Sequence, residues 1–276
     1  MILAAGLGTR MLPITKAVPK EMFPVGKKPM IQLAVEELYA SGIKKIAVVI
    51  RQGKEIIKEY LLSKYPHRLK LGKSITELEE LVSDLEISFV FQEEPTGIGG
   101  ALLAARDFVD DSPFIMLIPD QLVHATIPAT KQLVGNYAPN RRSMWSSLVQ
   151  LRKEEAPYFV GSGAFEFERL SQRQVKIKRL LSEEEASLLY REAPFEIRGI
   201  GRTILPPAIF DYLTRERIDP TTGEIDYRKA VKRYTESNPH YGVLLEGIAF
   251  DLGTFEGYYH YLPQIWRLTV KQAGIP

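Results

Sequence analysis

A loop rich in glycine, lysine and proline follows a short apolar run at the start of the chain. The run Met1–Ala5 leads into Gly6-Leu7-Gly8-Thr9-Arg10, and Lys16 and Lys20 follow in the same loop. An apolar run that ends at glycines is typical of a strand that ends at the ligand-binding edge of an α/β sheet. Glycines let the backbone approach a phosphate and present amide N–H groups to it, and the cations add further donors. The loop therefore predicts a binding site for a polyphosphate such as a nucleoside triphosphate.

The glycine pattern by itself completes no known nucleotide-binding fingerprint. A dinucleotide-binding loop requires a third glycine where Met11 stands, and a P-loop requires Gly-Lys-Ser/Thr where Thr9 and Arg10 stand. A tight turn without function is an equal alternative for Gly6 and Gly8 taken alone. The prolines of the loop favour phosphate binding, because proline fixes φ and stiffens a loop that presents charges.

A second glycine-rich turn, Gln92–Gly100, lies between an expected strand and an expected helix. It fits two interpretations equally well. One is an ordinary connection between the two elements. The other is a shelf on which a nucleobase stacks against bare backbone, while the side-chain amide of Gln92 offers both a donor and an acceptor to the base.

Two aspartates are each expected at the carboxyl end of a strand. Asp120 follows the apolar run 114–118, and Asp251 ends the run 243–250. Carboxylates at this edge can hold a Mg²⁺ ion that bridges phosphates. A lone Asp120 is more simply a helix cap or a solvent-exposed acid. Because two such residues occur beside polyphosphate-binding loops, the sequence favours a shared metal site.

The composition excludes several classes of function. The chain has 276 residues, no cysteine and a net charge of +2, so disulfides and thiolate metal sites are excluded and binding to nucleic acid or membrane is not indicated. The four histidines show no metal-ligand spacing, and no apolar run is long enough to span a bilayer. No basic segment precedes the first apolar run, so we expect no signal peptide. We expect a cytoplasmic protein that forms a homo-oligomer.

The elements that must position these residues alternate between strands and helices in the first half of the chain. Apolar spacing predicts strands at 43–50, 87–91 and 114–118, and helices at 30–38, 57–65, 74–85 and 99–109. Such alternation predicts an α/β fold with a mostly parallel, mixed sheet that carries helices on both faces. In the second half we expect strands at 144–151, 174–181, 202–205 and 243–250, a short helix after Pro206, and a C-terminal helical tail after Phe255.

The stretch LAAGLGTRMLPITKAVPKEMFPVGKKPMIQ resembles the N-terminal signature of the sugar-1-phosphate nucleotidylyltransferases, and is most similar to that of the bacterial UTP–glucose-1-phosphate uridylyltransferases. The resemblance continues in order through 92–101, 119–120, 201–202, 223–225 and 251–254. It implies a Rossmann-like nucleotidyltransferase domain over 1–276, with a nucleotide-binding half at 1–125 and a sugar-binding half with the helical tail at 126–276. It also implies the reaction: a nucleoside triphosphate and a sugar 1-phosphate give an NDP-sugar and pyrophosphate.

The resemblance implies a role for individual residues. Arg10 and Lys20 would bind the triphosphate and, with Asp120, serve catalysis, and Asp120 and Asp251 would hold Mg²⁺. The positions that resemble base- and phosphate-contacting residues of the family are Ala5, Gly6, Gly8, Thr9, Gln92 and Gly97. The positions that resemble its sugar side are Gly161 and Glu224.

Two departures from the family pattern concern the acceptor. The family usually carries Glu-Lys-Pro on a strand of the second half, whose Glu holds sugar hydroxyls and whose Lys holds the sugar phosphate, whereas this chain reads VKIKRLL at 175–181. Lys178 or Arg179 could supply the charge for the sugar phosphate. Gln121 stands where a second Asp is common. The alternative function is therefore a catalytically weak paralogue that binds nucleotide or nucleotide-sugar as a regulatory subunit.

Overall fold

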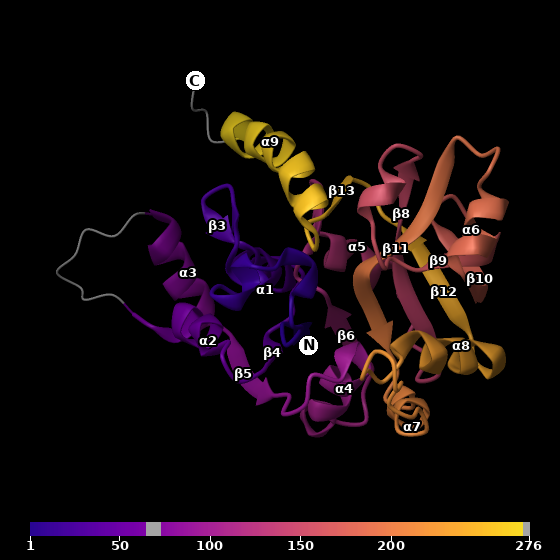
Figure 1. The fold of residues 1–276 in the computed structure, drawn as a ribbon, viewed down its shortest axis with the longest axis horizontal. Coiled ribbons are helices and arrows are strands. Elements are labelled where there is room, and N and C mark those ends of the chain that lie inside the picture. The colour runs from indigo at the N-terminus through magenta and orange to yellow at the C-terminus, as the bar shows by residue number, and fades with distance from the viewer. Residues whose placement is uncertain (65–72, 273–276) are drawn as a thin grey trace.

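The computed structural model describes residues 1–64 and 73–272, with only the backbone at 73, 74 and 269–272. A nine-stranded sheet runs through the molecule in the order β5-β4-β1-β6-β11-β8-β12-β10-β9, and the C-terminal helix extends beyond it (Figure 1). Its strands are β1 (Ile2–Leu3), β4 (Lys45–Ile50), β5 (Glu86–Phe91), β6 (Phe114–Leu117), β8 (Met144–Arg152), β9 (Ala164–Arg169), β10 (Gln174–Leu181), β11 (Phe195–Leu205) and β12 (His240–Leu244). Two small ribbons pair β2 (Pro24–Val25) with β3 (Lys28–Pro29), and β7 (Gln121–His124) with β13 (Ile248–Asp251).

Helices connect these strands. The α-helices are α1 (Met30–Ala40), α2 (Glu55–Leu62), α3 (Lys73–Ser83), α4 (Gly97–Ala104), α5 (Ala129–Asn136), α6 (Glu183–Leu189), α7 (Ile209–Leu213), α8 (Tyr227–Ser237) and α9 (Phe255–Gln272). Short 3₁₀ turns occur at η1 (Thr9–Met11), η2 (Ile14–Lys16), η3 (Lys20–Met22), η4 (Arg106–Phe108) and η5 (Ala156–Tyr158). Within the two described ranges, no helix is both long and apolar enough to cross a membrane.

The first half of the sheet is parallel and covered on both faces. Strands β5, β4, β1 and β6 run parallel, and alternate side chains of each strand enter opposite cores. Ile46 and Val48 pack with Ile31 and Leu38 of α1 on one face. On the other face Val49 joins a core built from α4, α7 and α8. The α/β fold with helices on both faces is confirmed.

The second half of the sheet is largely antiparallel. β11 pairs antiparallel with β6 and β8, and β10 pairs antiparallel with β12 and β9, while β8 and β12 are parallel. The sheet is thus mixed, as expected, but its parallel character belongs mainly to the first half. The long β11, which includes the expected strand 202–205, carries the chain from one half to the other.

The expected strand at 243–250 was wrong in its extent. The segment forms two strands, β12 and β13, separated by a turn at Gly247 with φ of 128°. A positive φ of this kind breaks a strand and favours glycine. β13 leaves the main sheet and pairs antiparallel with β7, with Asp251 opposite Gln121. The sequence patterns also missed β7, β9, α5 and α8.

The other expected elements agree with the structure to within a few residues. The helix expected at 57–65 is α2, and position 65 lies outside the described residues. The sequence Ser74-x-x-Glu77 also predicts a capping box at the start of the helix expected at 74–85, and the Ser74 side chain lies outside the described residues. The helix expected at 99–109 starts earlier, at Gly97, and ends as the 3₁₀ turn η4.

An ion pair between the fully buried Arg202 and the largely buried Glu37 joins the two halves of the sheet to α1. Arg202 on β11 donates to Glu37 on α1 through Nη2 at 2.6 Å and Nε at 2.9 Å, and also donates to the backbone O of Gln121. Glu37 further accepts hydrogen bonds from the backbone N and hydroxyl of Thr130 on α5. Burial alone would raise the pKa of Glu37, but Arg202 and Thr130 outweigh it and the pKa lies below its usual value. The ion pair therefore connects four elements, namely α1, α5, β7 and β11.

We predict that Arg202→Leu lowers the free energy of unfolding by about 3–5 kcal/mol, because it leaves the Glu37 carboxylate buried without its counter-charge. Urea unfolding monitored by circular dichroism measures this loss. Lys44→Ala is the control, because it breaks the solvent-exposed pair between Lys44 and Asp84 and should leave the midpoint nearly unchanged. Equal midpoints for both variants would contradict the role given to Arg202.

Candidate active site

Twelve of the thirteen site residues expected from the sequence line one cavity. This loop cavity, with a volume of about 430 Å³, lies at the carboxyl ends of β1, β5 and β6 and is bounded by the 6–10 loop. The residues that it brings together are Ala5, Gly6, Gly8, Thr9, Arg10, Lys20, Gln92, Gly97, Asp120, Gly161, Glu224 and Asp251. Lys178 does not line it.

The 6–10 loop is held in a tight turn by its glycine. Gly8 has a φ of 69°, in the left-handed region, and its O accepts a 2.8 Å hydrogen bond from the hydroxyl of Thr15. A methyl group on Gly8 would lie 3.1 Å from the Thr15 side chain, so both the conformation and the space favour glycine. Beyond this turn, Arg10 is exposed and its Nη1 donates to the O of Val160 at 3.4 Å. The turn therefore presents Arg10 at the edge of the cavity.

Lys20 and Asp120 form an ion pair inside the loop cavity, with Lys20 Nζ 2.6 Å from Asp120 Oδ2. Burial disfavours the charge on each group, but their mutual attraction outweighs it, so the pKa of Lys20 is raised and that of Asp120 is lowered. The second oxygen, Asp120 Oδ1, is buried and has no hydrogen-bond partner among the described residues. A buried carboxylate oxygen without a partner is costly, which makes it a candidate ligand for a cation.

Asp251 is buried beside Asp120. A methyl group on Gly253 would lie 2.6 Å from Asp120 Oδ2 and 3.1 Å from Asp251 Oδ1, so both carboxylates border this glycine. Burial and the charge of Asp120 raise the pKa of Asp251 to about 7. Asp251 Oδ2 accepts a 2.7 Å hydrogen bond from Gln121 Nε2. Asp120 and Asp251, which were both expected at strand ends, therefore lie close together. Because their charges repel, a cation bound between them would be stabilising.

Gln121 is a structural residue of the site that the sequence pattern did not identify as such. Its Nε2 also donates to Ser162 Oγ at 3.0 Å, and its Oε1 accepts from the backbone N of Gly201 at 2.6 Å. The only signal in the sequence was its departure from the second Asp common in the resembled family. An amide can bridge these donors and acceptors without adding a third negative charge.

A second missed feature is a buried ion pair beneath the loop. Lys54 Nζ lies 2.8 Å from Glu21 Oε2 and donates to the O of Ala4 at 2.8 Å. Both side chains are almost fully buried. Glu21 is the neighbour of Lys20, so the pair fixes the part of the loop that carries Lys20 against the end of β1. A single lysine after a strand gives no pattern that would reveal this contact.

The turn after β5 has the close packing expected of a shelf. Gln92 is buried, and its Nε2 donates to the O of Gly97 at 3.3 Å. Gly97 has a φ of 73°, and a methyl group there would lie 2.7 Å from Glu224 Oε2. At Gly100 a methyl group would lie 1.8 Å from the hydroxyl of Thr96. With the amide nitrogen committed to the turn, the oxygen of Gln92 is left to accept from a ligand.

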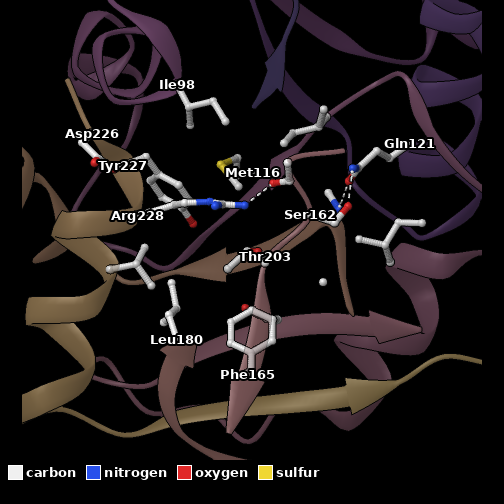
Figure 2. A pocket seen from close by; sticks show the side chains of 18 of the residues that line it. Ile98, Met116, Gln121, Ser162, Phe165, Leu180, Thr203, Asp226, Tyr227 and Arg228 are labelled. Atoms are coloured by element: carbon white, nitrogen blue, oxygen red, sulfur yellow. Dashed lines mark hydrogen bonds between the residues drawn. The ribbon is translucent and has the colours of Figure 1, made fainter. Parts of the chain in front are cut away.

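A second cavity, here called the sheet cavity, opens beside the first and also has a volume of about 430 Å³. It shares Arg10, Gln121 and Gly161 with the loop cavity. Figure 2 shows Phe165 and Leu180 on one side, Met116 and Ile98 on the other, and Arg228 extended between them. Its walls are largely apolar, and the charged groups that line it are two guanidiniums, of Arg10 and Arg228, and three carboxylates, of Asp219, Glu224 and Asp226.

The structure does not bring Lys178 into either cavity. β10 carries an irregularity in its pairing with β9 between Ile177 and Arg179, and Lys178 and Arg179 are both exposed. Lys178 Nζ lies 4.0 Å from Glu168, and Arg179 is paired with Glu166 and Glu185. Leu180 is the β10 residue that lines the sheet cavity.

Comparisons with known proteins agree with this geometry. Residues 1–266 match the family of nucleotidyl transferases. The chain is 34% identical to the UTP–glucose-1-phosphate uridylyltransferase 1 of Staphylococcus saprophyticus over 94% of this chain and 88% of that protein, and 33% identical to a UTP–glucose-1-phosphate uridylyltransferase of Bacillus subtilis over 94% and 87%. A UDP-glucose pyrophosphorylase solved with UDP-glucose superposes with a TM-score of 0.82 at 26% identity, covering 96% of this chain and 97% of that one. The chain belongs to the nucleotidyl transferase family.

His240 lies in the wall of the sheet cavity and is fully buried between Ser146 and Thr235, whose hydroxyls lie 2.9 Å from Nε2 and 3.1 Å from Nδ1. Burial lowers the pKa of His240 to about 3. Because the unfolded chain protonates this group near pH 6.5, its contribution to stability is complete above that pH and is lost as the pH falls towards 3.

We predict that the His240→Gln variant loses about 2 kcal/mol less stability than the wild type when the pH is lowered from 7 to 5. Urea unfolding of both proteins at the two pH values measures the difference. Other titrating groups are common to both proteins and cancel in the comparison. Identical losses would show that His240 is not held neutral in the folded state.

Proposed function

We propose that this chain transfers UMP from UTP to a sugar 1-phosphate, with glucose 1-phosphate as the acceptor, and releases UDP-glucose and pyrophosphate. The observation that carries the proposal is that Arg10, Lys20 and two buried carboxylates line one cavity beside a glycine turn. The names of the matched uridylyltransferases and pyrophosphorylases support the choice of substrates. They give no support to the alternative of a regulatory binding subunit.

In the proposed reaction, an oxygen of the sugar phosphate attacks the α-phosphorus of UTP in line with the leaving group. A phosphorus–oxygen bond forms as the bond to the β-phosphate breaks, and pyrophosphate leaves with the bonding electrons. No covalent intermediate with the protein is required. The work of the protein is to position two anions and to neutralise their charge. Arg10 and Lys20 serve the triphosphate, because both line the cavity at the phosphate-binding turn.

A divalent cation fits the residues present, and we propose Mg²⁺. Asp120 Oδ1 is a buried oxygen without a hydrogen-bond partner, and Asp251 lies beside it. The described residues contain no group of three or more His, Cys, Asp or Glu that could hold an ion by themselves. Two carboxylates completed by phosphate oxygens are the usual surroundings of Mg²⁺ at a nucleotide. When bound, the ion would reduce the repulsion between the two phosphate groups.

The base-binding part of the proposal rests on Gln92 and Gly97. The free oxygen of Gln92 can accept the N3–H of uracil, whereas the N1 of adenine is itself an acceptor. The shelf at Gly97 leaves little room because Glu224 packs against it. Thymine offers the same hydrogen-bonding edge as uracil, so dTTP would also be used.

The absence of cysteine agrees with a cytoplasmic location, and we keep the expectation of a homo-oligomer as part of the proposal.

We predict pyrophosphate release from UTP with glucose 1-phosphate and Mg²⁺, at a kcat/KM well above that with ATP or GTP. A coupled pyrophosphate assay with UTP, dTTP, ATP or GTP and a panel of sugar 1-phosphates measures this preference. A preference for ATP would contradict the role of Gln92. The control is Arg10→Ala, which removes an exposed side chain, should remain folded, and should lower kcat at least about 10²-fold. A normal rate in this variant would remove Arg10 from the mechanism.

A second prediction separates the metal site from the nucleotide site. We predict that Asp251→Ala lowers Mg²⁺-dependent turnover at least about 10²-fold, because charge stabilisation at the reacting centre is lost, while UTP binding remains measurable by calorimetry. The matched control is Asp211→Ala, which removes an exposed carboxylate on α7 and should turn over normally. Turnover of Asp251→Ala at the wild-type rate would refute the proposed metal site.

A further inference from the structure

The loss of Glu-Lys-Pro leaves the acceptor phosphate without an obvious counter-charge, and the three cations of β10 do not replace it. Lys176, Lys178 and Arg179 are exposed and line neither cavity. Arg179 is already balanced by Glu166 and Glu185. A cation that binds the acceptor must therefore come from another element.

Arg228, in the first turn of α8, is such a cation. Together with Arg10 it is one of two cationic residues among the described residues that line the sheet cavity. Figure 2 shows its guanidinium extended into the cavity between Met116 and Thr203. The residue is exposed to solvent at the mouth, so an incoming anion can reach it. No sequence pattern predicted a role for Arg228, because α8 was not expected.

The charge of Arg228 is not neutralised by a neighbouring carboxylate. Within residues 1–64 and 73–272 no ion pair to this guanidinium occurs, although Asp219, Glu224 and Asp226 also line the cavity. The carboxylates of Asp219 and Asp226 are engaged elsewhere: both lie within 4.0 Å of Lys229 Nζ, Asp219 accepts two backbone N–H groups, and Asp226 accepts one. A cation in the first turn of a helix also opposes the helix dipole, so its position is unfavourable unless an anion binds there.

The contacts of Arg228 place it at the junction of the two cavities. Its Nη2 donates to the O of Gly161 at 2.5 Å, while Arg10 donates to the O of the preceding residue, Val160. The two guanidiniums thus bind consecutive carbonyls of one peptide segment, and Gly161 of that segment lines both cavities. The hydrogen bond to Gly161 uses one of five N–H donors of Arg228, and the remaining donors suit a phosphate, which arginine binds through paired hydrogen bonds.

We propose that Arg228 binds the phosphate of the acceptor sugar 1-phosphate, in place of the lysine that the family usually carries on a strand. The inference rests on the proposed function, since it names the residue that recognises the second substrate of that reaction. The acceptor enters the sheet cavity with its phosphate between Arg228 and Arg10, next to the α-phosphate of UTP in the loop cavity. The sugar ring then lies against the largely apolar walls that include Phe165 and Leu180.

The test compares Arg228→Gln, Arg228→Lys, Lys178→Gln and Lys232→Gln. Loss of a hydrogen bond to a charged group corresponds to roughly a 10- to 100-fold loss of affinity. We expect Arg228→Gln to raise the KM for glucose 1-phosphate by that factor and to change the KM for UTP less than about threefold. Arg228→Lys should recover part of the loss. Lys232→Gln, an equal change of charge on an exposed position of α8, should behave like the wild type. An effect at Lys178 with none at Arg228 would overturn the proposal.

Binding measurements separate this inference from the proposed function. Calorimetric titration of glucose 1-phosphate into protein saturated with the α,β-methylene analogue of UTP requires no turnover. If the wild type releases no pyrophosphate with any sugar 1-phosphate, the proposed function fails, and the titration still decides on Arg228. Weaker binding in Arg228→Gln than in the wild type supports the proposal. Equal binding in the two proteins, or no binding by the wild type, overturns it.

Discussion

Two carboxylates that repel each other are held together in a buried site. Several of the groups around them offset their charge or hold them in place. Lys20 neutralises Asp120, and the neutral amide of Gln121 holds Asp251. Glu21 and Lys54 fix the loop that carries Lys20 without adding net charge. The raised pKa of Asp251 indicates that the protein's own groups do not fully offset the negative charge of the two carboxylates. A site with this residual demand for positive charge suits a cation that arrives together with phosphates.

The mixed sheet explains how two anionic substrates can meet at this point. Its parallel half ends in loops that surround the loop cavity, at the carboxyl edge where ligands bind in such sheets. Its antiparallel half supplies the walls of the sheet cavity through β8, β10 and β11. β11 belongs to both halves, and the buried pair of Arg202 and Glu37 fixes it to α1. The relative placement of the two cavities therefore depends on packing in the core and not on a mobile connection.

The residues of the loop cavity could be predicted because their signals are local. Gly8, Arg10 and Lys20 lie in one short loop, and apolar runs mark the strands before them and before Asp120. The sheet cavity could not be predicted in the same way. Its walls come from antiparallel strands that pair across long stretches of sequence, and a pairing irregularity beside Lys178 changes which β10 side chains reach the cavity. The expected strand at 243–250 is likewise divided by the turn at Gly247 into β12 and β13, which belong to different sheets. Apolar character alone does not show where a chain passes from one sheet to another.

The ribbon of β7 and β13 sets an order in which the site can assemble. Gln121 and Asp251 are partners across this ribbon although 130 residues separate them in the chain. Protein synthesis proceeds from the N-terminus, so the glycine loop, Lys20 and Asp120 all leave the ribosome long before β13 exists. Until then β7 has an unpaired edge, which is a site for wrong pairing. A nascent or truncated chain that stops before residue 251 therefore has the glycine loop but not the second carboxylate, and any chemistry that needs both carboxylates must wait until β13 has been made.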